Sequence, residues 1–595
     1  MKTLWKLTAL LLSLTLAAGC AASSSSEETN TVSSTESIAT LNEAEMFTER
    51  DRETAFDLAQ CVTVELKDQA TICTDASVRV TGNNVVLTGD KTYYLSGVLT
   101  NGSLTVQASD TAKPRLIFDG VTVTAAEQAP LTVVSADKVF VTLAPHSVNR
   151  LENQQGFANA VDADTDGAVF SRQDLTINGG GALTVTSPAG HAITCKDDLV
   201  VVGGSYTLQS AGHGLDANDS IRIAHGTFTV NAGKDGIHAE NNDDASLGYV
   251  YVADMTVSGQ VQGDGISAAS ALWIKQGAVT LTAGGGHENG QTTSSEQYGG
   301  FMGGMPHGMR PTADTSQAET TTDEAATSMK GLKAGTTLQI DGGTFALDTA
   351  DDSLHTNGTA AIHGGTFTLR SGDDGIHADS ALDIYDGAVT IETAYEGLEA
   401  LTVTLHGGNI TMNTTDDGIN AAGGNDQGGY GGRDEAPFGG PHGGMGGPGG
   451  GGASNGKVII NGGTVYIQMK GDGIDANGLI EMTGGHVTVC GPTTGDTAVL
   501  DYDTSATISG GTFIGTGAYQ MAQTFSDTKQ PMLAVSVGNQ SAQTKVTVTN
   551  AKGQTLLSYA PALDYAILLF SSPDLKTGDT VTLQIGSASE EFTIS

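Results

Sequence analysis

The sequence predicts an all-β protein built as a parallel β-helix, and three observations lead to this prediction. A short phrase recurs at a constant spacing, at positions 331, 353, 375 and 397, and again at 418. A second phrase, Gly-Gly-Thr-Phe, recurs with the same spacing, at 342–345 and 364–367. The chain also contains 81 glycines and only 5% aromatic residues, which suits short strands and tight turns better than helices.

A fixed period within the range of about 20–50 residues is typical of a solenoid, in which each copy is one coil that buries its apolar face only against its neighbours. Apolar residues alternate over short stretches within a coil, as in Leu338/Ile340 and Phe345/Leu347. Three short strands joined by turns account for about 22 residues per coil, which is the arithmetic of a parallel β-helix. We expect the Gly-Gly pair and the Asp-Asp-Gly phrase to mark two tight corners, where glycine supplies backbone angles that other residues resist.

Composition and periodicity divide the chain into segments. The predicted segments are a signal peptide (1–20), a Ser-rich flexible tether (21–46), an N-terminal cap with irregular first coils (47–168), regular coils (169–519) and a small C-terminal β cap domain (520–595). Residues 47–75 are expected to close the N-terminal end, because an uncapped solenoid exposes a sheet edge. Two low-complexity insertions interrupt the coils, at about 285–328 and 423–456. Their Met and His residues suit a soft metal, but no ligand spacing recurs, which favours surface loops.

The segment from Met1 to Cys20 has the plan of a targeting segment. Lys2 and Lys6 precede an apolar run that ends in Gly19-Cys20, which resembles a bacterial lipoprotein signal. A lipidated Cys20 would then anchor the protein on the extracellular face of the cell membrane. A plain secretory signal is the alternative, because Ala17 is a weak residue at the leading position of the lipobox. No other stretch is long and apolar enough to span a membrane.

The remaining cysteines divide into two pairs. Cys61 and Cys73 lie close in sequence and form either a disulfide, as exported proteins allow, or two buried thiols. Cys195 and Cys490 lie in alternating apolar stretches and are expected in the core. There is no Cys-x-x-Cys, so neither a zinc nor a redox motif of that kind is present.

The repeated corner carries most of the chemistry. Stacked coils place equivalent side chains about 4.8 Å apart, so the Asp-Asp-Gly phrase predicts a ladder of carboxylates that repel by about 1 kcal/mol per pair near water's dielectric constant. Ca²⁺ fits as the counter-charge because it takes several oxygen ligands in irregular geometry. Histidines in the ladder allow a transition metal, but the excess of oxygen favours calcium. The predicted metal ligands are Asp351, Asp352, Asn357, Asp373, Asp374, Asp379, Asp416, Asp417, Asn420, Asp472 and Asp475. A purely structural ladder of turn residues is the alternative.

These motifs resemble a known family. Lys330-Gly331-Leu332-Lys333-Ala334, Asp373 to Asp379, Tyr395 to Glu399 and Asp416 to Ala421 are similar to segments of the bacterial carbohydrate-binding-domain-containing lipoproteins. The resemblance extends over about 47–595 and includes both Gly/Met-rich insertions. It implies a right-handed parallel β-helix with bound calcium that binds cellulose-like and acidic sugars such as polygalacturonate, in a fold like that of calcium-dependent pectate lyases. Ala192 and Ser353 replace the usual glycine, which leaves calcium in their coils open.

The leading functional hypothesis is a monomeric, calcium-dependent cell-surface protein that binds acidic plant polysaccharide, such as pectin, or cellulose-like glycans without turnover. The net charge of −40 excludes nucleic acid and permits an acidic polymer only through cations or a local basic patch. The predicted sugar contacts are Lys330, Lys333, His355, His377, Glu396 and Glu399. A calcium-dependent polysaccharide lyase, with Lys330 or Lys333 as the base, is one alternative. A calcium-stiffened adhesin is another, because two tryptophans provide no sugar-stacking platform.

Overall fold

The computed structural model describes residues 41–290, 328–421, 455–495 and 497–594. The described chain is all-β, as predicted, and contains no α-helix. Its only helical turns are the 3-10 segments η1 (Glu43–Glu45), η2 (Leu58–Gln60) and η3 (His287–Asn289). No helix in these ranges is long and apolar enough to cross a membrane. The predicted signal peptide, Cys20, residues 21–40 and most of both insertions lie outside the described residues.

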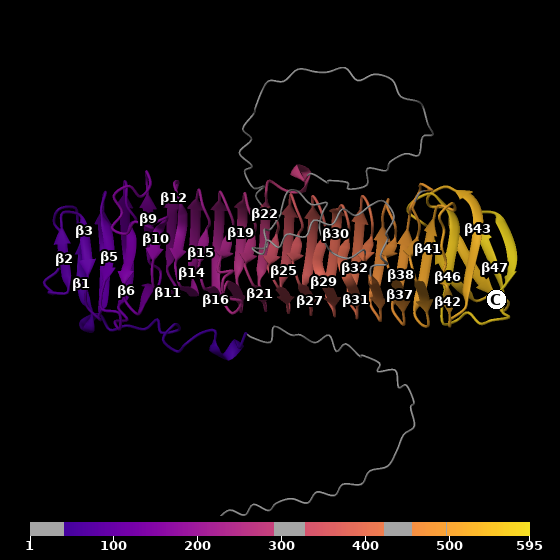
Figure 1. Ribbon diagram of the computed structural model, residues 1–595, viewed down its shortest axis with the longest axis horizontal. Coiled ribbons are helices and arrows are strands. Elements are labelled where there is room, and N and C mark those ends of the chain that lie inside the picture. The colour runs from indigo at the N-terminus through magenta and orange to yellow at the C-terminus, as the bar shows by residue number, and fades with distance from the viewer. Residues whose placement is uncertain (1–40, 291–327, 422–454, 496, 595) are drawn as a thin grey trace, which may run out of the picture. The chain divides into compact units, whose positions relative to one another are not determined.

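Parallel pairing dominates the largest sheet, and it forms three ladders. Figure 1 shows the repeats following one another broadly in chain order, from β2, β3 and β1 at one end to β41, where β46 lies beside it. The first ladder contains β3 (Asn84–Leu87), β5 (Ser103–Gln107), β7 (Leu131–Ser135), β10 (Gly167–Ser171), β13 (His191–Cys195), β15 (Leu215–Ala217), β17 (Ile237–Ala239), β20 (Ile266–Ala268), β23 (Leu332–Ala334), β26 (Leu354–Thr356), the starts of β29 (Ile376–Ile384) and β31 (Leu398–Leu405), β33 (Ile419–Ala421), β36 (Ile474–Ala476) and β39 (Leu500–Tyr502).

The second ladder lies next along each repeat. It contains β1 (Val62–Leu66), the starts of β4 (Thr92–Leu99) and β6 (Arg115–Ala125), β8 (Lys138–Leu143), β11 (Asp174–Gly179), the starts of β14 (Asp198–Ser210) and β16 (Ser220–Ala232), β18 (Tyr249–Val252), β21 (Ala271–Ile274), β24 (Thr337–Ile340), β27 (Thr359–Ile362), the ends of β29 and β31, β34 (Lys457–Ile460), β37 (Leu479–Met482), β40 (Ser505–Ile508) and β42 (Asp527–Thr528).

The third ladder completes each repeat. It contains the ends of β4, β6, β14 and β16 together with β9 (Val148–Asn153), β12 (Ala182–Ser187), β19 (Thr256–Val261), β22 (Ala278–Ala283), β25 (Thr344–Thr349), β28 (Thr366–Ser371), β30 (Ala388–Ala394), β32 (Asn409–Thr414), β35 (Thr464–Gln468), β38 (His486–Cys490) and β41 (Thr512–Gly517). One continuous apolar core, from Val64 to Leu569, fills the space between the ladders. Phe345 and Phe367 stack within it at 4.8 Å.

The ends of the ladders differ from their middle. At the N-terminal end, β2 (Val78–Thr81) pairs antiparallel with β3. At the other end, β46 (Tyr565–Ser571) pairs antiparallel with both β41 and β43 (Met532–Gln540). A separate four-stranded antiparallel sheet follows in the order β45 (Thr555–Tyr559), β44 (Val546–Asn550), β47 (Thr580–Ile585) and β48 (Ala588–Thr593).

The segment before β1 corrects two sequence predictions. Residues 41–46 are not a free tether, because Met46 is buried and the Glu43 carboxylate contacts Lys275 Nζ at 2.6 Å. Residues 47–55, the first part of the predicted end closure 47–75, lie along the second ladder rather than over its end: Phe47 contacts Tyr251, with ring centroids 5.9 Å apart. Buried Asp51 accepts a 2.6 Å hydrogen bond from Thr176 and lies 3.0 Å from Lys138 Nζ. The chain thus runs back along the ladder before β1 begins.

Glycine is required at the two corners for different reasons. Gly343 and Gly365, the second glycines of the Gly-Gly pairs, have φ values of 115° and 112°, as the expected corner angle requires. Gly375 in the Asp-Asp-Gly corner has no positive φ; instead, a Cβ there would lie 2.6 Å from the carbonyl oxygen of Gly397. The second corner therefore selects glycine by close approach of the next repeat. The prediction of unusual backbone angles was wrong there.

The cysteine predictions have a mixed outcome. Cys195 and Cys490 are fully buried, as expected. For Cys61 and Cys73 the sequence left a disulfide and two buried thiols open; both are free thiols in the structure, and both are half-buried.

Candidate metal and carbohydrate site

Side chains of the Asp-Asp-Gly corner form a column that we call the corner column. From β15 to β36 it consists of the residue two positions before each strand of the first ladder: His213, Asp235, Asp264, Lys330, Asp352, Asp374, Glu396, Asp417 and Asp472. In the repeat before these, the equivalent residue is His191, the first residue of β13. A second column, the strand column, lies three positions further on and contains Thr194, Asp216, His238, Ser267, Lys333, His355, His377, Glu399, Asn420 and Asp475, paired in register.

Hydrogen bonds between successive repeats explain why the corner column carries hydrogen-bond acceptors. Asp235 Oδ1 accepts a 2.7 Å hydrogen bond from the backbone N–H of Asp264, and Asp264 Oδ1 accepts one of 2.7 Å from Lys330. The same bond, at 2.9 Å, joins Asp374 N–H to Asp352 Oδ1. Each carboxylate thus satisfies a backbone donor of the next repeat with one oxygen. Its second oxygen remains for other partners.

Lys330 interrupts the carboxylates of the corner column. Its Nζ lies 2.8 Å from Asp351 Oδ1 and 3.1 Å from Asp352 Oδ2, and all three side chains are buried. Burial raises the pKa of Asp352, but the Lys330 charge and a bond to His355 outweigh burial and lower it overall. Lys333, in the strand column, lies 3.9 Å from Asp264. The two lysines therefore supply positive charge to this part of the ladder.

Histidines pair with the next two carboxylates. His355 Nδ1 lies 2.8 Å from Asp352 Oδ2, and its Nε2 lies 2.9 Å from Asn357 Oδ1. His377 is fully enclosed among three carboxylates, at 3.2 Å from Asp374, 3.1 Å from Asp379 and 2.9 Å from Glu399. Predicted metal ligands and predicted sugar contacts are here bonded to each other.

Beyond His377 the ladder is dominated by acids. Among the described residues no ion pair involves Glu396, Asp416, Asp417 or Asp475. Burial and the charges of Asp416, Asp472 and Asp475 raise the pKa of Asp417 well above its usual value. Burial and Asp472, Asp501 and Asp503 raise the pKa of Asp475 to about 7. We call Glu396, Asp416, Asp417, Asn420, Asp472 and Asp475 the acid cluster.

Asn420 adds an unsatisfied acceptor to the acid cluster. Its Nδ2 donates to Glu396 Oε2 at 2.8 Å, which fixes the orientation of the amide. Its Oδ1 is buried and has no hydrogen-bond partner in the part of the chain that the structure describes. Because a buried unpaired oxygen costs about 1–3 kcal/mol, a cation beside it would satisfy both this oxygen and the surrounding carboxylates.

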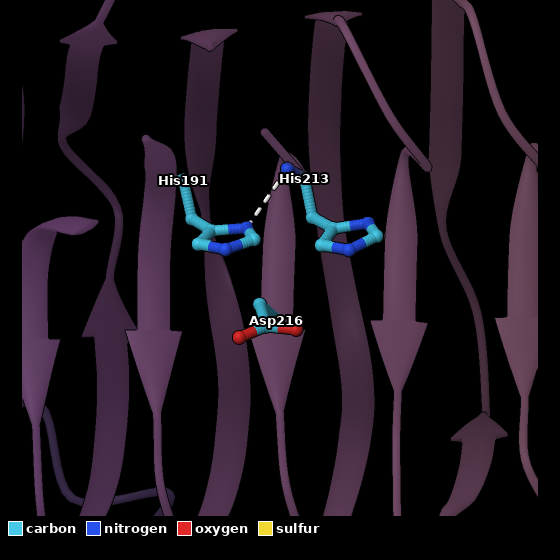
Figure 2. A group of neighbouring side chains, drawn as sticks. All are labelled: His191, His213 and Asp216. Atoms are coloured by element: carbon cyan, nitrogen blue, oxygen red, sulfur yellow. Dashed lines mark hydrogen bonds between the residues drawn. The ribbon is translucent and has the colours of Figure 1, made fainter. Parts of the chain in front are cut away.

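The opposite end of the corner column is a histidine stack that the sequence prediction did not include as a site. His191 and His213 are parallel at 4.8 Å, with Asp216 below and between them (Figure 2), and His238 continues the stack at 4.3 Å. His191 Nδ1 accepts the backbone N–H of His213 at 2.9 Å, and His213 Nδ1 accepts that of Asp235 at 3.1 Å. The regular spacing of the two histidines in the sequence was the available signal.

This stack is poorly arranged for a metal. A ring nitrogen that accepts a hydrogen bond carries no proton, so the proton of each neutral ring lies on Nε2. The Nε2 atoms are therefore donors near Asp216, whereas a metal needs their lone pairs. Burial lowers the pKa of His191 to about 4 and that of His213 to about 3, so both rings are neutral at pH 7.

Aromatic residues form an outer ladder at the turn after the second ladder. His363, Tyr385 and His406 stack with centroids 4.7 and 4.4 Å apart. Because the rings cover one another, most of their faces are unavailable to a sugar. The ladder therefore does not replace the missing tryptophan platform.

Comparison with known proteins identifies the family of this chain. A family model described as "Carbohydrate-binding domain-containing protein" matches residues 81–375. A protein of the same description from Acetivibrio thermocellus is 38% identical over 208 residues, which cover 35% of this chain and 73% of that protein. The chain belongs to the carbohydrate-binding domain-containing protein family. Among solved structures, the gadolinium derivative of a polysaccharide lyase-like protein from C. thermocellum matches with a TM-score of 0.36 and 28% identity, over 38% of this chain and 91% of that one.

The family match covers only part of the two columns. It includes the histidine stack, Lys330, Lys333 and Asp352, and it ends at Gly375. The acid cluster begins at Glu396 and so follows the end of the matched range. What the acid cluster binds must therefore be argued from its own chemistry, and family membership alone does not supply the ligand.

The histidines of the two columns give a first test of these contacts. Burial lowers the pKa of His377, but its bonds to three carboxylates outweigh burial and raise the pKa well above 6.5, so we expect an imidazolium across neutral pH. His191 and His213 should stay neutral over the same range. Their ¹⁵N imidazole shifts, assigned with His377→Gln and His213→Gln, measure both states. A His377 titration midpoint near 6.5 would show that the three carboxylates do not hold its proton.

Proposed function

We propose that the protein binds acidic plant polysaccharide of the polygalacturonate or pectin type, or a cellulose-like glycan, without turnover, and that Ca²⁺ bridges an acidic sugar to the acid cluster. The observation that carries this proposal is the accumulation of Glu396, Asp417 and Asp475 without basic partners around the unsatisfied Asn420 oxygen. A protein with a net charge of −40 repels a polyuronate unless a cation lies between them.

The donors of the acid cluster suit calcium. Carboxylates and an amide oxygen from three successive repeats provide oxygen ligands and no nitrogen or sulfur, and calcium accepts six to eight oxygens in flexible geometry. Asn420, Asp417, Asp472, Asp475 and Glu396 would hold the ion. When bound, it would supply positive charge to both protein and uronate carboxylates. Half-buried Asp417 and Asp475 can be reached from solvent.

Among the predicted metal ligands, the observed contacts support one group over the other. Asp351, Asp352, Asp374, Asp379 and Asn357 already bond to Lys330, His355 or His377. They are therefore poorer candidates for the ion than the acid cluster. Asp373 precedes Asp374 in the chain and is also buried.

The remaining parts of the proposal concern fold and location. We propose that the three ladders form a right-handed parallel β-helix, supported by the parallel register between equivalent positions of successive repeats. We also propose that a lipid on Cys20 anchors the protein, as a monomer, on the extracellular face of the cell membrane.

Lys330 Nζ contacts two buried carboxylates, which makes it a poor base for a lyase reaction.

Retention on immobilised polygalacturonate tests the proposed function. The protein is expected to bind in millimolar Ca²⁺ and to elute when a chelator is added, with no rise in the ultraviolet absorbance of an unsaturated product. Retention that survives chelation would contradict the calcium bridge. Growth of the product absorbance would contradict binding without turnover.

A further inference from the structure

A groove at the N-terminal end of the first ladder has a different chemistry from the acid cluster. It has a volume of about 650 Å³ and is formed by three successive turns that lead into β3, β5 and β7. Its polar lining includes Gln69, Asn83, Asn84, Asn101, Glu127 and Gln128. Glu127 is the only charged residue of the lining, and no aromatic residue contributes.

Three amides of the groove, those of Asn101, Gln128 and Gln69, are each held in place by one polar atom, whereas Asn83 uses both, because its Nδ2 donates to Asp68 Oδ1 at 3.0 Å. Asn101 Oδ1 accepts the backbone N–H of Ala126 at 3.0 Å, and Asn84 Oδ1 accepts Gln128 Nε2 at 3.1 Å. Gln69 Nε2 donates to Asn83 Oδ1 at 3.2 Å. These bonds join neighbouring turns, so the side chains are oriented before any ligand arrives.

The opposite side-chain atoms of Asn101, Gln128 and Gln69 have no partner within the described residues. Asn101 Nδ2 remains as a donor, whereas Gln128 Oε1 and Gln69 Oε1 remain as acceptors. Glu127 uses one carboxylate oxygen for Asn159 and retains the other. The groove thus presents fixed donors and acceptors side by side. Sugar hydroxyls, which both donate and accept, match such a lining.

Charge distinguishes this groove from the acid cluster. Without a basic group in its lining, it has no counter-charge for a uronate carboxylate, and Glu127 repels one. Without a cluster of carboxylates, it has no need of calcium. Its volume lies in the range of small-ligand sites, about 300–1,000 Å³. The lining therefore selects uncharged sugar units.

We infer that this groove is a calcium-independent subsite for neutral sugar units, placed on the same edge of the first ladder as the acid cluster. The inference rests on the proposed function for its ligand class, a polysaccharide. Eleven pairings of the first ladder separate Asn101 in the turn before β5 from Asp417 before β33, about 50 Å at roughly 4.8 Å per pairing. A chain with neutral and acidic stretches can contact both, and the two contacts reinforce one another.

Affinity electrophoresis in a chelator tests the inference with neutral polymers, hydroxyethyl cellulose, xyloglucan and galactan. Wild type is expected to be retarded by at least one polymer, and Glu127→Ala with Gln128→Ala is expected to weaken that retardation at least tenfold. The matched control is Glu481→Ala with Gln209→Ala, at exposed strand positions elsewhere.

The outcomes separate this subsite from the calcium bridge. No retardation by any neutral polymer, retardation that requires Ca²⁺, or full retardation of the Glu127/Gln128 variant would each overturn the inference. The Glu127/Gln128 variant should keep its calcium-dependent retention on polygalacturonate. If wild type binds a neutral polymer but is not retained on polygalacturonate in Ca²⁺, only the proposed calcium bridge is contradicted.

Discussion

Replacing Asp417 and Asp475 together with asparagine is expected to abolish calcium-dependent retention on polygalacturonate and to remove the thermal stabilisation that Ca²⁺ gives to wild type. Asparagine keeps the size of both side chains, and its Oδ1 can still accept the backbone N–H of Asp472, which Asp417 Oδ1 accepts at 2.5 Å. The substitutions therefore remove charge while leaving the corner intact. A ligand at 100 times its Kd stabilises by about 2.7 kcal/mol, and this increment should disappear.

Without calcium, the same variant should be more stable than wild type at neutral pH. Asp475 has its pKa raised to about 7 in the folded protein, by burial and by Asp472, Asp501 and Asp503, against about 3.9 in an unfolded chain. A raised folded pKa gives stability that is present below about pH 4 and is lost as pH rises to about 7. In a chelator, the melting temperature of wild type should therefore fall as the pH rises through this window. The melting temperature of the variant should fall less.

The control is Asp254→Asn with Asp386→Asn, which makes the same charge change at two exposed positions. It should keep both the calcium-induced rise in melting temperature and the retention on polygalacturonate. If the Asp417/Asp475 variant also keeps them, the ion lies elsewhere. If wild type shows no calcium effect but still has the pH slope, the acid cluster is a protonated structural ladder.

The repeat made much of the architecture predictable. Equivalent positions of successive copies were expected to lie side by side, and the register confirms this for Lys333, His355 and His377. The alternation of apolar residues likewise predicted the buried faces of strands such as β25. The register and the buried faces both follow from the repeat period of the sequence, because each strand pairs with the equivalent strand of the previous repeat.

Contacts that do not repeat could not be obtained in this way. The path of residues 43–55 along the second ladder depends on single partners far away in sequence, such as Asp51 with Thr176. The spacing placed Lys330 next to Asp351, but only the structure shows its ammonium group between two buried carboxylates. The sequence therefore predicted one calcium-binding ladder with Lys330 and Lys333 at one end, whereas the structure divides the ladder into a part with bonded counter-charges and a part without them.

The Lys330→Met substitution is expected to destabilise the protein strongly, by about 3–5 kcal/mol, because it leaves the buried carboxylates of Asp351 and Asp352 without their counter-charge. Methionine retains much of the apolar stem, so packing changes little. Urea unfolding followed by circular dichroism measures the effect. Lys275→Met, which removes a partner of the exposed Glu43 carboxylate, is the control and should cost less than about 1 kcal/mol.

Restoring charge balance separates a counter-charge from a sugar contact or a base. Lys330→Met combined with Asp351→Asn and Asp352→Asn leaves no unpaired ion at this place and should recover most of the lost stability. Lys330 was predicted as a sugar contact and, in the lyase alternative, as the catalytic base. If it only neutralises Asp351 and Asp352, the triple variant will be retained on polygalacturonate in Ca²⁺ as wild type is. A folded triple variant that no longer binds would instead show that the Lys330 ammonium group reaches the sugar.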